Sequence, residues 1–165
     1  MHGPIAEDVY VDFARSLFTE REKTIEEDPI RWAFKLFDGN TFYMQRTMNG
    51  AFADTPSGTT CGHDTVARAV RSMLAANEVI YREILSTIKV SQKATLYAIA
   101  RERVASSPTG GAFIKKHALP SSSSVQSALI KLSRAGLISK GEDGYSLSDP
   151  LLRIFINGLY STPEV

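Results

Sequence analysis

The chain has 165 residues, of which 43% are hydrophobic; this is typical of a globular protein and excludes a chain that is disordered throughout. Its net charge of +1 hides an asymmetry, because residues 1–88 carry 9 Lys and Arg against 13 Asp and Glu, whereas residues 90–148 carry 8 against 3. No apolar run approaches the roughly 20 residues of a membrane-spanning helix, and no apolar segment near Met1 resembles a secretory signal. We therefore expect a cytoplasmic, mainly α-helical protein with two units that have different partners.

The first 89 residues predict four amphipathic helices. The spacing of apolar residues and the helix-start signals give the ranges 5–20, 30–37, 41–52 and 64–88. Phe42, Met48 and Phe52 of the third helix are expected in the hydrophobic core. In the first helix we expect one apolar stripe to face the core, and it consists of Ile5, Val9, Phe13 and Leu17.

The segments between these helices predict exposed turns and loops. Residues 20–28 are rich in charge and are expected to form a solvated turn. Residues 54–62 contain Pro56, Gly58 and Gly62, which predict a flexible loop around Cys61. Because Cys61 is the only cysteine, the chain has neither an intrachain disulfide nor a zinc site built on several thiolates.

The segment of residues 119–137 is the most informative part of the second half. Its apolar residues Val125, Ala128, Leu129 and Leu132 recur at i, i+3, i+4 and i+7, which predicts one buried helix face. A serine run that begins at Ser121 offers an N-terminal cap, and a glycine at position 136 offers a stop. The segment therefore predicts a helix with one apolar face.

The flanking segments complete the layout of a winged helix-turn-helix. Ser91 is expected to cap a helix over residues 92–104, whose apolar stripe ends at Val104, and residues 111–118 predict a short helix. Two short alternating segments joined by a turn at residues 141–144 predict a β-hairpin. Asp149 is expected to cap a closing helix over residues 150–160.

The opposite face of the 119–137 helix and its surroundings supply candidate contact residues. Hydroxyl, amide and cationic side chains can bind phosphate or base edges, and an apolar side chain among them suits a protein surface. The candidates for contact with DNA or with another domain are Lys115, Lys116, Ser123, Gln126, Ser127, Ile130, Lys131, Arg134 and Lys140.

The sequence lacks the common signatures of catalysis. It contains no GxxxxGK[ST] phosphate-binding loop and no HExxH metal motif, and the spacing of its histidines indicates no catalytic triad. We interpret His117 as a turn residue between two helices. We therefore predict no catalytic, cofactor-binding or metal-binding residues, and a chain that is not an enzyme by itself.

Four segments together carry a resemblance to a known family. They are residues 38–45 (DGNTFYMQ), 92–100 (QKATLYAIA), 111–126 (GAFIKKHALPSSSSVQ) and 145–153 (YSLSDPLLR). They resemble the C-terminal region of AAA+-type P-loop ATPases of the prokaryotic signalling (STAND) class, the archaeal-type ATPases also common in Bacteroidetes. In that family a nucleotide-binding domain precedes a helical lid and a winged helix.

The resemblance implies that this chain has two domains and that the ATPase domain of the family is absent from it. Residues 1–89 would form a helical, lid-like domain, and residues 90–165 would form a winged-helix domain with a closing C-terminal helix. The chain would be a C-terminal fragment of a longer ATPase. ATP and magnesium are then implied for the absent N-terminal ATPase domain, which is the implied partner, and not for this chain.

Two functions remain open for the predicted helix-turn-helix. A regulatory module would dock on the ATPase domain, which fits the outward-facing Ile130 and the acidic hairpin turn at Glu142 and Asp143. A DNA-binding module would place the same helix in the major groove of double-stranded DNA, with its lysines and arginines on phosphates and its serines and Gln126 on base edges. We favour docking, because an acidic turn and an exposed isoleucine suit a protein surface better than a phosphate backbone.

Overall fold

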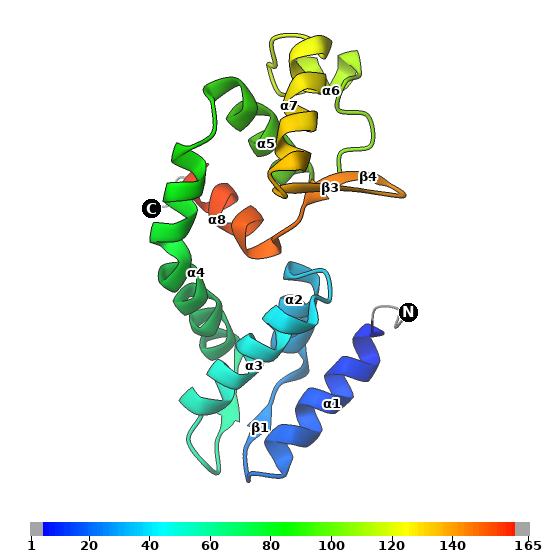
Figure 1. The fold of residues 1–165 in the computed structure, drawn as a ribbon. Helices are drawn as coiled ribbons and strands as arrows, with labels where there is room; N and C mark the ends of the chain where they lie inside the picture. Colours follow the sequence, from blue (N-terminus) through cyan, green and yellow to red (C-terminus); the bar gives the residue numbers. More distant parts are fainter. Residues whose placement is uncertain (1–4, 161–165) are drawn as a thin grey trace. The chain divides into compact units, whose positions relative to one another are not determined.

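The computed structural model describes residues 5–160 (Figure 1). The chain divides into two compact units, Met1–Asn77 and Glu78–Val165. Both are mainly helical, as predicted, and within the described residues no helix combines the length and the hydropathy needed to cross a bilayer. The assignment of residues 1–89 and 90–165 as lid-like and winged-helix domains stays a prediction.

The first unit contains α1 (Glu7–Thr19), α2 (Glu27–Leu36), α3 (Thr41–Asp54) and the N-terminal part of α4 (His63–Ser86). A short parallel pairing joins its loops, because β1 (Thr24–Ile25) lies beside β2 (Thr60–Cys61). Large buried side chains form the core between these elements; they include Phe18, Ile30, Phe37, Met44 and Val66.

Both predicted loops of this unit contain a strand. The segment of residues 20–28 is not a solvated turn, because it contains β1, where Ile25 is buried, and the start of α2. Cys61 does not lie in a flexible loop, because it pairs with Ile25 in β2 and is buried. Burial raises the pKa of the Cys61 thiol, so it stays protonated at neutral pH.

The predicted buried face of α1 is wrong. Val9 and Phe13 are 60% and 55% exposed, and Ile5 and Leu17 are exposed with them. A second apolar face is buried instead, and it consists of Tyr10, Val11, Ala14 and Phe18. Phe42 is also exposed, because α3 turns Met44, Thr47, Met48 and Ala51 inward.

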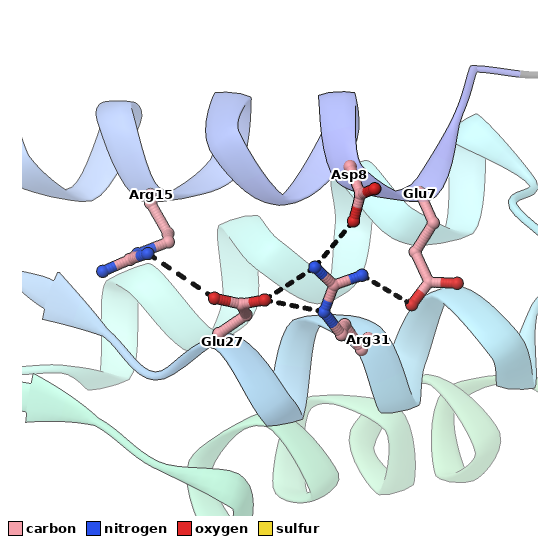
Figure 2. A network of polar contacts seen from close by, with 5 residues as sticks. All are labelled: Glu7, Asp8, Arg15, Glu27 and Arg31. Atoms are coloured by element: carbon pink, nitrogen blue, oxygen red, sulfur yellow. Dashed lines mark hydrogen bonds and ion pairs between the residues drawn. The ribbon is translucent and has the colours of Figure 1, made fainter.

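A charged network between α1 and α2 accompanies the burial of Val11 and Phe18 (Figure 2). The guanidinium of Arg31 on α2 lies 2.7 Å from Asp8 and 3.1 Å from Glu7 on α1, and 2.6 Å from Glu27 on its own helix. Arg15 of α1 approaches Glu27 at 3.7 Å. The carboxylates of Asp8, Glu27 and Glu7 raise the pKa of Arg31, so the guanidinium stays charged. Because the first turn and the middle of α1 both contact α2, one rotation of α1 is favoured.

The second unit contains the C-terminal part of α4, then α5 (Val90–Glu102), α6 (Gly111–Lys116), α7 (Ser122–Arg134), β3 (Ile138–Gly141), β4 (Gly144–Leu147) and α8 (Pro150–Tyr160). β3 and β4 form the predicted antiparallel hairpin, with Ile138 opposite Leu147. Ala105 pairs with Tyr145 and adds a third strand segment to the hairpin. The core lies among α5, α7 and α8 and includes Leu96, Ile99, Leu132, Leu151 and Ile156.

Two of the three predicted caps of this unit are confirmed. Ser121 accepts a 3.1 Å hydrogen bond from the backbone N–H of Ser124 at the start of α7. Asp149 accepts one of 2.9 Å from Leu151 at the start of α8. The cap predicted at Ser91 is wrong, because Lys89 occupies the cap position of α5 and makes no side-chain hydrogen bond there.

The predicted end of α5 is also wrong. α5 ends at Glu102, and the backbone of Arg103 adopts φ +63°. This turn brings Ala105 beside Tyr145. Val104 therefore lies after the helix and is exposed.

Candidate interaction face

α7 has one buried and one exposed face. Val125, Ala128, Leu129 and Leu132 are buried, as their spacing predicts, and α7 packs against α5 and β3. The side chains on the opposite side are all exposed; we call them the outer face of α7, and they are Ser123, Gln126, Ser127, Ile130, Lys131 and Arg134. The sequence therefore predicted correctly which side of α7 is buried and which is exposed.

Ile130 lies at the centre of the outer face of α7 and is 45% exposed. Gln126 and Arg134 are one turn away on either side, and Ser123 and Ser127 lie on the same side of the helix. An isoleucine of this exposure gains free energy when another apolar surface covers it. An apolar side chain surrounded by polar ones is an arrangement typical of protein–protein interfaces.

The basic candidates outside α7 have different surroundings. Lys115 and Lys116 are exposed on α6, but Lys116 forms an ion pair with Glu102 of α5. Lys140 on β3 lies with its ammonium 5.7 Å from the centre of the Tyr145 ring. These lysines are accessible, yet Lys116 is already partly neutralised.

The turn between β3 and β4 is acidic. Glu142 and Asp143 are exposed at the tip, between Gly141 and Gly144. Two carboxylates at the most protruding point of a hairpin repel a phosphate backbone and suit a basic protein surface.

His117 lies in the turn after α6, as predicted, and it also contacts Glu102 of α5. It follows the last residue of α6, and its Nε2 lies 2.8 Å from Glu102 Oε1, while its ring contacts that of Phe113 at 4.6 Å. Lys116 and His117 hold the pKa of the Glu102 carboxyl below its usual value. The contact joins residues 15 positions apart, so no local pattern could indicate it. It ties α6 to the end of α5.

The described residues contain no group of three or more His, Cys, Asp or Glu side chains placed to hold a metal ion. The roles of the candidate residues in contact with DNA or with another domain stay predictions, as does the absence of catalytic residues.

Comparison with known proteins identifies the fold of the second unit. Residues 79–158 match the family model of a probable winged helix domain. The second unit is a winged helix. In this winged helix, α6 and α7 form the helix-turn-helix, and the β3–β4 hairpin is the wing.

A solved structure is similar in fold to most of this chain. The Walker-type ATPase of Pyrococcus abyssi matches 93% of this chain and 42% of its own length, with 18% sequence identity and a TM-score of 0.57. This likeness shows a shared fold, and the chain spans less than half the length of that ATPase. No curated protein matches the sequence.

Proposed function

We propose that this chain is the non-catalytic part of an AAA+-type ATPase and that its winged helix acts as a regulatory, interdomain module. Four sequence segments resemble that class of ATPase, and the fold similarity to a Walker-type ATPase supports the proposal. In this proposal ATP, magnesium and the catalytic residues belong to a separate ATPase domain. The winged helix docks on that domain and responds to its nucleotide state.

The exposed Ile130 at the centre of the outer face of α7 carries the proposal. Fully burying an isoleucine contributes roughly 1.5–3 kcal/mol, and covering the exposed 45% of Ile130 about half of that, whereas a charge on an exposed surface contributes about 0–1 kcal/mol. A DNA-reading helix gains little from an isoleucine in this position, because phosphates and most base edges are polar. The acidic tip at Glu142 and Asp143 supports a protein partner for the same reason.

The experiment measures association with the ATPase domain, produced as a separate polypeptide from the same gene region. We expect Ile130→Ser to weaken association by about tenfold or more, and Lys131→Glu or Arg134→Glu to weaken it less. Val90→Ser is the matched control, because Val90 is exposed and lies outside the outer face of α7. Equal affinity of the parent chain and Ile130→Ser would show that this face does not dock.

Binding of double-stranded DNA is the second candidate function. The outer face of α7 presents Lys131 and Arg134 together with Gln126 and two serines, all exposed. In that case the cations would bind phosphates and Gln126 would face a base edge. The two candidates differ in which residues matter, since DNA binding depends on the charges and docking depends on Ile130.

A further inference from the structure

The loop between α5 and α6 begins with a strained residue. Arg103 has φ +63° and ψ −52°. This combination lies outside the left-handed helical region, and it is rare and unfavourable for a residue with a side chain. Such strain persists only where surrounding contacts hold it, and it is frequent at positions that change conformation. A contact beyond Arg103 must therefore hold its backbone.

The pairing of Ala105 with Tyr145 of β4 is that contact. Two hydrogen bonds of 2.8 Å and 2.9 Å join their backbones. Ala105 is 2% exposed, and its carbonyl oxygen packs so closely on Gly144 that a Cβ there would lie 2.2 Å from it. Because Ala105 comes only two residues after Arg103, the chain must leave the helix at Arg103 to reach β4. The pairing with the wing thus accounts for the strained turn.

The local sequence favours a longer α5. Residues 101–106 (RERVAS) contain neither glycine nor proline, and the first proline after α5 is Pro108. Alanine, arginine and glutamate are among the strongest helix formers. A helix that continued through Ser106 would end just before the residue that precedes Pro108, which is where helices usually end. No local signal therefore ends α5 at Glu102.

The position of Val104 also favours a longer α5. Val104 is 46% exposed in the loop. In a continued helix it would follow Leu96 and Ala100 at intervals of four residues and would lie on the same face. Leu96 and Ala100 are fully buried. The helical conformation would thus add Val104 to the buried face of α5, whereas the observed turn exposes it.

The loop is loosely packed against α6. A hollow of about 250 Å³ lies between them, lined by Val104, Ser106 and Ser107 of the loop and by Ala112 and Phe113 of α6. A segment that borders a hollow loses few packing contacts when it changes conformation. The pairing of Ala105 with Tyr145 is then the main contact that opposes the helix.

We propose that residues 103–106 switch between two conformations. In the paired conformation, which is the one described above, Ala105 adds a third strand segment to the wing. In the helical conformation this pairing is broken, α5 continues through Ser106, and Val104 joins its buried face. The edge of β4 at Tyr145 is covered in the first conformation and open in the second. The switch therefore controls whether the wing presents an unpaired strand edge, to which another extended chain can add.

The first experiment is NMR relaxation dispersion on the whole chain. We expect exchange on the microsecond-to-millisecond timescale at residues 103–106 and at Tyr145, with a minor population of roughly 1–10%. The ¹³Cα chemical shifts of the minor state should be helical over residues 103–106. An absence of exchange at these residues, or minor-state shifts typical of an unstructured chain, would overturn the proposal.

Two variants at Arg103 test the role of the strain. Arg103→Gly relieves the strain of the paired conformation and disfavours the helix, so the helical population should fall by at least about tenfold. Arg103→Ala is the matched control, because it removes the same side-chain contacts but keeps the Cβ and favours the helix. Its helical population should equal or exceed that of the parent chain. Equal populations in the two variants would show that Arg103 is not under strain.

Two glycine variants test the role of the pairing. Gly144→Ala should displace Ala105, so that residues 103–106 show helical ¹³Cα shifts in the major state. Gly141→Ala should keep the paired conformation, because a Cβ there meets its nearest atom at 3.9 Å. Unstructured shifts over residues 103–106 in a folded Gly144→Ala chain would contradict the switch. The Arg103 variants leave Gly144 intact, so they decide the question even if Gly144→Ala does not fold.

Discussion

The backbones of Ala105 and Tyr145 exchange two hydrogen bonds, of 2.8 Å from Ala105 N–H to the Tyr145 carbonyl and 2.9 Å in the reverse direction. The pairing fixes the loop after α5 against the wing. It also places the Ala105 carbonyl against Gly144, where a Cβ would lie 2.2 Å from that oxygen. Gly144 has φ +135°, a backbone conformation that residues with side chains rarely adopt.

Gly144→Ala should therefore destabilise the winged helix, by roughly 1–3 kcal/mol, because it strains the backbone and separates Ala105 from Tyr145. Urea unfolding followed by circular dichroism measures the change. Gly141→Ala is the control, since a Cβ at Gly141 meets its nearest atom at 3.9 Å. Equal midpoints for the two variants would show that the close approach is absent in solution.

Shortening a side chain of α7 should affect stability strongly on its buried face and weakly on its exposed face. Leu129→Ala should lower the free energy of unfolding by roughly 2–5 kcal/mol, because Leu129 is buried and its loss leaves a cavity. Ser127→Ala on the outer face should change it by less than about 0.5 kcal/mol. Similar shifts in the urea midpoints of both variants would mean that the two faces are assigned wrongly.

The helix-turn-helix and the wing could be predicted from the sequence because α7 has apolar residues on one side only. Val125, Ala128, Leu129 and Leu132 leave one choice of buried face, and the Ser121 cap and the turning Gly136 give its ends. In α7 the spacing of apolar residues in the sequence agrees with the packing in the structure, so the spacing was sufficient to predict the buried face.

α1 shows why the rest could not be predicted. Apolar residues occur on most of its circumference, so the periodicity fits the face of Val9 and Phe13 as well as that of Val11 and Phe18. The ion pairs of Arg31 with Glu7 and Asp8 favour the second face, and they join residues 24 and 23 positions apart in the sequence. The exposure of Val9 and Phe13 follows from that choice, so it could not be predicted before α1 was oriented.

Stability at low pH should depend on Glu102. Lys116 and His117 hold its pKa below the usual value, so the carboxylate stabilises the folded state above the unfolded pKa of about 4.3. That contribution is lost as the pH falls through the lower, folded-state pKa. Urea midpoints measured between about pH 7 and 3 should fall less steeply for Glu102→Gln than for the parent chain. Parallel curves would show that the contacts with Lys116 and His117 contribute nothing in solution.

The chain alone should not bind ATP. It has no phosphate-binding loop, whose backbone N–H groups and lysine provide a preorganised site for a triphosphate. Calorimetric titration with ATP and magnesium should give no heat above that of dilution. A saturable isotherm in the micromolar range would reveal a nucleotide site and contradict the assignment of ATP to a separate domain.

Titration of a labelled DNA duplex tests the central claim most directly, because docking and DNA binding use the same outer face of α7. Anisotropy at about 50 and 200 mM salt should show at most weak binding in the chain, in Ile130→Ser and in Lys131→Glu, since few phosphates are neutralised. Tight binding with a steep salt dependence, lost in Lys131→Glu but kept in Ile130→Ser, would show that the outer face of α7 reads DNA and does not dock on a protein.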